Sequence, residues 1–183
     1  MKRKTNMLHY LIGDATTPIK TPALIAHTVN DKNRWGSGFV IAVSKNDKRP
    51  EEMYHRWHKK EGGKDLPLGA VQICPFTSGN QVANMVAQHD TKPINGVPPV
   101  RYDALRQALK SVFYHAKKNN FTVHCPRICA VRSGGDWNQI EKIIKEEMGD
   151  IETYIYTLPN EKDQWPQKYE NDDATPDVTE LFD

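Results

Sequence analysis

Two loops of this chain have the composition of anion-binding sites. One, residues 31–38, follows the apolar run 24–30, and the other, residues 129–136, follows the run 123–128. Glycines let backbone N–H groups approach an oxyanion, and the amino terminus of a following helix adds a favourable potential. Two such loops facing each other would clamp a diphosphate, whereas in ordinary strand-to-helix turns the glycines would serve only the turn geometry. Neither loop matches the Walker A or Gly-x-Gly-x-x-Gly pattern.

Three side chains are candidates for acid–base chemistry. An imidazole titrates near neutral pH, so His27 and His89 could transfer protons. For His27, inside an apolar run, a hydrogen-bonded structural role is the stronger alternative. His89 is followed by Asp90, whose carboxylate could orient the imidazole. Adjacent residues on a strand point apart, so this pairing requires a loop.

The cysteines do not indicate a metal or a disulfide framework. Cys125 and Cys129 with His124 match no common zinc-ligand spacing, so we expect no metal. Cys74 is the third cysteine, and three cysteines cannot all pair. A reducing, cytoplasmic location is expected.

The elements that must position these loops alternate along the chain. Strands are expected at 8–12, 24–29, 68–76, 81–87, 121–128 and 151–158, with a hairpin turn at 77–80. Helices are expected from Pro50 to Gly62, over 102–116 and over 137–148, while 38–44 fits a strand or a helix that opens at the glycines. This order predicts a mixed sheet with helices on its faces and a ligand at the carboxyl ends of its strands.

Length, hydropathy and charge limit the classes of protein to which the chain can belong. The chain has 183 residues, enough for one domain, and no apolar run of about 18 residues that would cross a membrane. We expect a basic lead at 1–6, a domain at 7–158 and an acidic extension without a core of its own at 159–183. That extension carries −6, which leaves +8 on the remainder. A basic body suits phosphate or nucleic acid, or is simply a solvated surface.

Several segments, in this order, resemble one family. They are Gly13-Asp14-Ala15-Thr16, Ile25-Ala26-His27-Thr28-Val29-Asn30, Trp35-Gly36-Ser37-Gly38, residues 82–88, residues 98–102, and Pro126-Arg127-Ile128 through Gly134-Gly135-Asp136-Trp137. Over residues 7–158 the chain resembles a macrodomain, closest to the branch of the yeast-type ADP-ribose 1''-phosphate phosphatase and its bacterial and phage relatives. The resemblance implies a three-layer α/β/α sandwich with a mixed central sheet.

The resemblance also implies roles for individual residues. Asp14 would accept a hydrogen bond from the adenine amino group, and Asn30 would face the distal ribose. The ligand-binding set is Asp14, Ala15, His27, Trp35, Gly36, Ser37, Gly38, Phe39, Gln88, Ala130, Val131, Arg132, Ser133, Gly134 and Gly135. The catalytic candidates are Asn30, His89 and Asp90, which would orient a water.

The chain departs from the family pattern in two places. In the second loop Cys129 and Val131 replace glycines, and a β-branched residue resists a positive φ, so this loop is expected to differ in shape. Arg132 replaces an apolar residue there and would contact an extra phosphate or point to water. Gln88 and Ser133 stand where related glycohydrolases have Lys and Asp, which argues against a lysyl-adduct mechanism.

We therefore expect binding of ADP-ribose or a close derivative, with hydrolysis of ADP-ribose 1''-phosphate as the leading activity. No cofactor, metal or membrane is required, and a monomer is expected. The alternative is a non-catalytic module that binds ADP-ribose or ADP-ribosylated proteins. A third hypothesis, single-stranded RNA binding, depends only on the basic body and Trp35.

Overall fold

The computed structural model describes residues 7–172, so the basic lead 1–6 and residues 173–183 of the acidic extension lie outside the described part. Its centre is one six-stranded sheet with the order β1-β6-β5-β2-β4-β3. The strands are β1 (Leu8–Ile12), β2 (Ala23–Asn30), β3 (Val71–Pro75), β4 (Gln81–Gln88), β5 (Thr122–Cys125) and β6 (Thr153–Thr157). β3 runs antiparallel to β4 and the other neighbours are parallel, which confirms the predicted mixed sheet.

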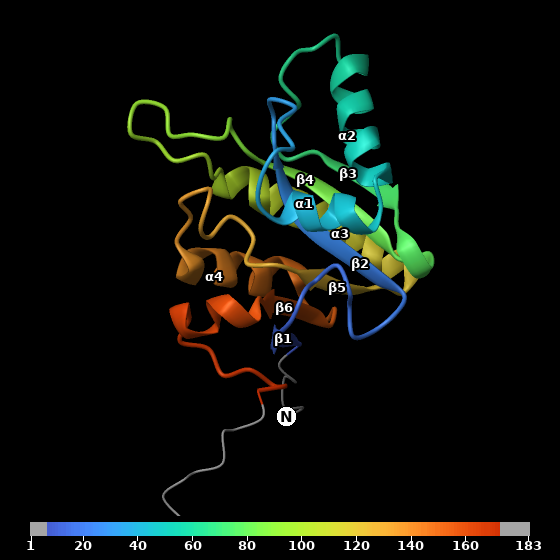
Figure 1. The fold of residues 1–183 in the computed structure, drawn as a ribbon, viewed down its shortest axis with the longest axis vertical. Coiled ribbons are helices and arrows are strands. Elements are labelled where there is room, and N and C mark those ends of the chain that lie inside the picture. Colours follow the sequence, from blue (N-terminus) through green and yellow to red (C-terminus); the bar gives the residue numbers. More distant parts are fainter. Residues whose placement is uncertain (1–6, 173–183) are drawn as a thin grey trace, which may run out of the picture.

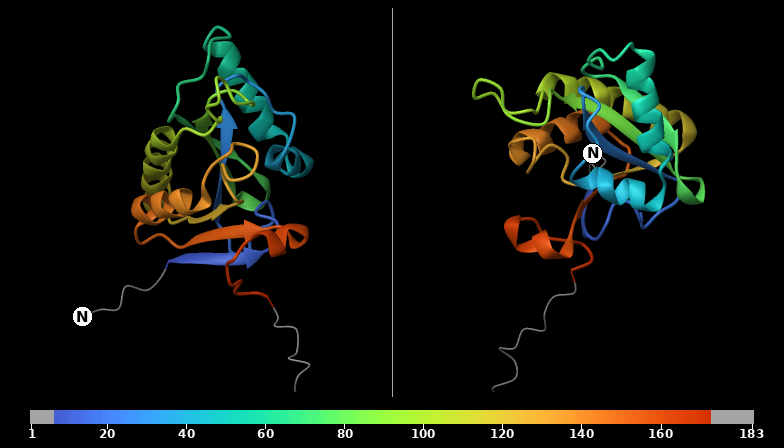
Figure 2. Two further views of the ribbon diagram at one scale, coloured as in Figure 1. Left: turned by 90° about the vertical axis from the view of Figure 1, so that its left-hand side faces the viewer. Right: turned by 45° about the horizontal axis from the view of Figure 1, so that its top comes forward.

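Helices cover both faces of this sheet (Figures 1 and 2). They are α1 (Phe39–Asn46), α2 (Arg49–Lys60), α3 (Tyr102–Asn119) and α4 (Trp137–Met148). Strand β2 shows why both faces are covered: Leu24 and Ala26 pack into the core under α3 and α4, while Ile25 and Val29 pack into the core under α1 and α2. Side chains alternate between the faces of a strand, so a strand buried on both faces needs two helical layers. The three-layer α/β/α sandwich is confirmed.

Two elements differ from the expected ones in ways that shape the site. The ambiguous segment 38–44 is helical, because α1 begins directly after Gly38, whose φ of 85° ends the preceding extended chain. Strand β5 ends at Cys125 rather than continuing to Ile128. Proline has no backbone N–H to donate to a sheet, so Pro126 ends the ladder. Residues 126–136 therefore form a long loop.

Residues 159–172, the described part of the expected acidic extension, pack onto the domain. The Trp165 ring lies 6.0 Å from that of Trp137, and Glu170 N donates to Tyr10 O. The guanidinium of Arg127 lies over the Trp165 ring and donates to Gln167 Oε1 at 2.8 Å. The packed body therefore continues to residue 172. Within the described residues no helix is both long and apolar enough to span a membrane.

Candidate functional site

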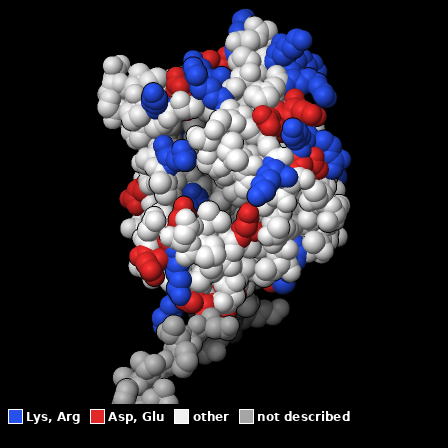
Figure 3. All heavy atoms as spheres, in the orientation of Figure 1, with Lys and Arg blue, Asp and Glu red and all other residues white. Residues whose placement is uncertain are grey.

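A cavity of about 1150 Å³ opens at the carboxyl ends of the parallel strands. The space-filling view shows a hollow on this face with basic and acidic side chains at its rim (Figure 3). The expected site residues that line the cavity are Asp14, Ala15, His27, Asn30, Trp35, Gly36, Ser37, Gly38, Phe39, Gln88, Ala130, Val131, Arg132 and Ser133. The expected residues absent from its lining are His89, Asp90, Gly134 and Gly135. Both predicted loops thus reach one cavity.

The first loop is held by the side chain of Asn30. Its Oδ1 accepts hydrogen bonds from the backbone N–H of Lys32 and of Arg34, and its Nδ2 donates to Arg34 O at 2.7 Å. The Tyr54 hydroxyl donates to Asn30 O at 2.6 Å. The Asn30 amide therefore shapes the loop, and both of its polar ends are already in use.

Gly38 and Arg132 bring the two loops together. A Cβ placed on Gly38 would lie 3.1 Å from Arg132 Cδ, so the arginine of the second loop crosses over the start of α1. The first N–H groups of a helix have no partner within the helix, and its N-terminus attracts negative charge. The guanidinium and the amino end of α1 together make this wall of the cavity favourable for an anion.

The second loop adopts a positive φ at one of the two positions where a glycine is replaced. Cys129 has φ 58° and Gly134 has φ 68°, whereas Val131 does not adopt a positive φ and is 63% exposed. Val131 thus avoids the conformation that a β-branched residue resists. At Gly135 a Cβ would lie 2.4 Å from Cys129 O, so this glycine allows the loop to close on itself. Gly134 and Gly135 shape the loop, and residues 126–133 line the cavity.

Asp14 follows β1 by two residues, and one of its carboxylate oxygens is held by Thr16. Its Oδ1 accepts hydrogen bonds from the N–H and the hydroxyl of Thr16, both at 2.8 Å. Its Oδ2 makes no hydrogen bond within the described residues. Because Asp14 lines the cavity, this oxygen is placed to accept a hydrogen bond from a ligand amine.

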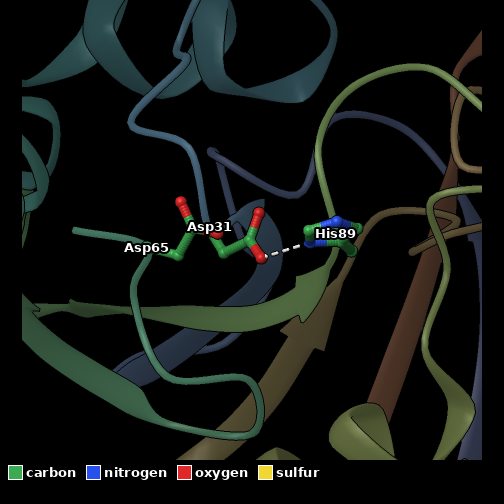
Figure 4. Close-up of side chains that lie close together, drawn as sticks. All are labelled: Asp31, Asp65 and His89. Atoms are coloured by element: carbon green, nitrogen blue, oxygen red, sulfur yellow. Dashed lines mark hydrogen bonds and ion pairs between the residues drawn. The ribbon is translucent and has the colours of Figure 1, made fainter. Parts of the chain in front are cut away.

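Asp31, and not Asp90, holds the imidazole of His89, which corrects the expected pairing (Figure 4). His89 Nδ1 lies 2.6 Å from Asp31 Oδ2, and Asp31 Oδ1 accepts from Asp90 N. The Asp90 carboxylate instead accepts from Thr91 N at 2.7 Å. Sequence reasoning missed Asp31, although it directly follows Asn30 in the first loop. The pair lies beside the cavity, whose lining includes Gln88 and Thr91.

One carboxylate–imidazole cluster has the make-up of a metal site. Asp31, Asp65 and His89 place one ligand atom each within 4.8 Å of the others. Both carboxylates already have partners, because Asp65 pairs with Lys32 at 2.7 Å while Asp31 bonds His89. The cluster is therefore satisfied by side chains of this chain.

Four further residues of the cavity lining bear on the chemistry. Gln88 Nε2 donates to Thr28 Oγ1 at 2.9 Å, and Ser133 is buried. Burial raises the pKa of the Cys129 thiol to about 11, which keeps it protonated and weakly nucleophilic. Trp35 is 7% exposed and packs against Tyr54, so its ring is not a stacking surface for RNA bases.

Comparison with known proteins identifies the class. No family model matches the chain. The structure of a macrodomain protein from Streptomyces coelicolor is 39% identical, with a TM-score of 0.71, and the match covers 82% of this chain and 98% of that one. A protein of unknown function from Bacteroides thetaiotaomicron is 43% identical, with a TM-score of 0.77, over 81% and 96% of the two chains. The structure of Thermosipho africanus DarTG in complex with ADP-ribose is 14% identical, with a TM-score of 0.60 over 75% and 38%, and shares the fold alone.

The sheet order, the two helical layers and the cavity at the strand ends define a ligand-binding α/β/α domain. The chain belongs to the macrodomain family. The mouse chromodomain-helicase-DNA-binding protein 1-like is 33% identical in an alignment of 167 positions that covers 85% of this chain. The chain spans 18% of the length of that relative. The branch of the yeast-type phosphatase stays a prediction.

Proposed function

We propose that this protein binds ADP-ribose or a close derivative and hydrolyses ADP-ribose 1''-phosphate. One observation carries the proposal: a single cavity is lined by Asp14 and by two loops, one of which leads into α1. The adenine amino group is a donor that suits the Asp14 Oδ2 acceptor. A diphosphate suits backbone N–H groups and a helix amino terminus. The ADP-ribose complex of Thermosipho africanus DarTG, a protein of the same fold, supports this ligand.

Charge at the loop junction supports the phosphatase activity. Arg132 lies against Gly38, where its guanidinium would neutralise the phosphoryl group on the distal ribose. Water attacks the phosphorus, the bond from phosphorus to the ribose oxygen breaks, and that oxygen takes a proton. The His89 imidazole, held by Asp31, is the group we assign to this proton transfer.

A second function, binding without catalysis, is favoured by two observations. Neither His89 nor Asp90 lines the cavity, and both polar ends of the Asn30 amide are engaged in the first loop. A protein of this kind would hold ADP-ribose or an ADP-ribosylated protein and leave it unchanged. A monomeric state and a cytoplasmic location stay predictions for either function.

Two measurements on the full chain separate these functions. Calorimetric titration with ADP-ribose comes first, and saturable micromolar binding is expected. A phosphate-release assay with ADP-ribose 1''-phosphate follows, and turnover is expected. Binding without turnover would assign the protein to the non-catalytic class. Absence of ADP-ribose binding, together with a steep salt dependence of single-stranded RNA binding, would favour the RNA hypothesis.

A further inference from the structure

His27 is a buried residue that lines the cavity, and only one of its two ring nitrogens makes a hydrogen bond within the described residues. It lies in the middle of β2, in register with Asn84 on the neighbouring strand β4. His27 Nε2 lies 2.5 Å from Asn84 Oδ1, and His27 is 1% exposed. His27 Nδ1 is buried and has no hydrogen-bond partner within residues 7–172. Buried polar atoms are rarely left unpaired, so this nitrogen calls for an explanation.

The proton position on His27 follows from a chain of hydrogen bonds that ends on backbone carbonyls. Gln72 Nε2 donates to Met53 O, which leaves Gln72 Oε1 as an acceptor. Asn84 Nδ2 donates to Gln72 Oε1 and to Pro50 O, both at 3.2 Å. Carbonyl oxygens can only accept, so the direction of the whole chain is fixed. Asn84 Oδ1 is therefore an acceptor, and His27 Nε2 carries the proton.

The other nitrogen of His27 is then a neutral acceptor. Burial lowers the pKa of His27 to about 4, so the imidazole is uncharged at neutral pH. With the proton on Nε2, Nδ1 presents a lone pair. A phosphate oxygen is also an acceptor and cannot satisfy it. Only a donor, such as a hydroxyl or an amine, can do so.

The surroundings of the ring leave the cavity as the source of that donor. His27 lies between the rings of Trp35 and Phe39, each with its centroid 5.5 Å from that of His27. The Trp35 Nε1–H is already donated to Ser44 Oγ at 2.8 Å, and Phe39 has no polar side-chain atom. All three residues line the cavity.

We propose that His27 Nδ1 accepts a hydrogen bond from a ribose hydroxyl of the bound ligand, and so selects a hydroxyl over a phosphate at this point of the cavity. The proposal rests on the proposed function, because it takes the ligand to be ADP-ribose. His27 is then a specificity-determining residue. The chain of hydrogen bonds from Met53 O through Asn84 determines which of its ring nitrogens carries the proton.

Nitrogen NMR of the full chain with 15N-labelled histidine tests this in the wild type. The unbound protein is expected to show His27 Nδ1 as an unprotonated nitrogen. Addition of ADP-ribose should shift that resonance in the direction of a hydrogen-bonded acceptor, while inorganic pyrophosphate, which carries no ribose, should leave it unchanged. ADP-ribose binding with an unshifted Nδ1 would overturn this inference alone. Absence of ADP-ribose binding would overturn the proposed function, and the inference with it.

Two matched substitutions separate the two nitrogens. The amide of Gln can reproduce the Nε2–H donor to Asn84 but not the Nδ1 acceptor, whereas the oxygen of Asn can reproduce the Nδ1 acceptor but does not reach Asn84. We expect His27→Gln to weaken ADP-ribose binding about five- to tenfold. His27→Asn should lose less affinity than His27→Gln, because it keeps an acceptor at the Nδ1 position, while lowering the melting temperature more. Equal affinity loss in both variants, or loss in the Asn variant alone, would contradict the assignment.

Discussion

The carboxylate of Asp31 holds the imidazole of His89, with Oδ2 2.6 Å from Nδ1. The Asp31 side chain is 3% exposed and that of His89 is 30% exposed. The backbone N–H of Asp90 donates a hydrogen bond to Asp31 Oδ1, the other oxygen of the same carboxylate. The segment after β2 is thereby tied to the segment after β4, and the imidazole has a fixed orientation beside the cavity.

This pair predicts a kinetic defect without a binding defect. His89→Ala should lower the rate of phosphate release from ADP-ribose 1''-phosphate roughly a hundredfold, the effect of losing a positioned acid–base group. Asp31→Asn should lower it less, about tenfold, because the imidazole remains but loses its charged partner. Titration calorimetry should give wild-type affinity for ADP-ribose in both variants. A rate unchanged in His89→Ala would remove this residue from the mechanism.

Asp14→Ala is expected to weaken ADP-ribose binding at least tenfold. The change removes a hydrogen bond to a charged acceptor, about 1.5–3 kcal/mol. The matched control is Thr16→Val, which removes the hydroxyl that donates to Asp14 Oδ1 and leaves Oδ2 in place. Calorimetry should give near wild-type affinity for Thr16→Val. Equal losses in both variants would mean that Asp14 serves only the turn after β1.

Substitutions in the first glycine loop should distinguish an effect on folding from an effect on ligand binding. A Cβ at Gly36 meets no atom within 4 Å, so Gly36→Val should keep the melting temperature and abolish ADP-ribose binding by blocking close approach to the backbone. Gly38→Val is expected to lower the melting temperature as well, because Gly38 has φ 85° and Arg132 lies 3.1 Å from its Cβ position. Wild-type affinity in Gly36→Val would show that the loop does not approach the ligand.

The protein should release little or no ADP-ribose from glutamate-modified proteins. Gln88 cannot form an adduct with ribose, and its amide is bonded to Thr28 Oγ1. Ser133 is a poor base at neutral pH. The measurement is release of ADP-ribose from a glutamate-modified protein, with phosphate release from ADP-ribose 1''-phosphate as the positive control. Robust release from the protein would mean that the assignment of these two positions is wrong.

Two buried histidines predict loss of stability in mild acid. Burial lowers the pKa of His27 and of His124 to about 4, against about 6.5 for an unburied histidine. The unfolded chain therefore binds more protons than the folded one between these pH values. The free energy of unfolding is therefore highest above pH 6.5 and decreases as the pH falls toward 4. The two histidines act in the same direction, so their effects on the free energy of unfolding add.

Chemical denaturation at pH 7 and pH 5 measures this effect. The free energy of unfolding should be lower at pH 5, and the slope of its denaturant dependence should be unchanged. The His27→Asn variant is expected to lose part of the pH dependence, because Asn does not titrate. The same free energy of unfolding at both pH values would contradict the burial of neutral imidazoles.

The sequence alone determined the layers and the position of the loops. Apolar residues at helical spacing indicate α3, and a run such as Leu24–Val29 indicates a strand buried on both faces. These are local patterns, because helix and strand periodicities repeat within a few residues. The same local reading placed glycine-containing loops after β2 and β5, which the structure brings to one cavity.

Only the tertiary structure decided which side chains are partners. His89 pairs with Asp31, 58 residues away, rather than with its neighbour Asp90, because β2 and β4 are adjacent and end at the same edge of the sheet. The lone pair of His27 is likewise set by a relay through Gln72 and Asn84 on two other strands. Such pairings depend on strand order and register, which join residues far apart in the chain. Residue types specify what each side chain can donate or accept, and the packed sheet decides what it meets.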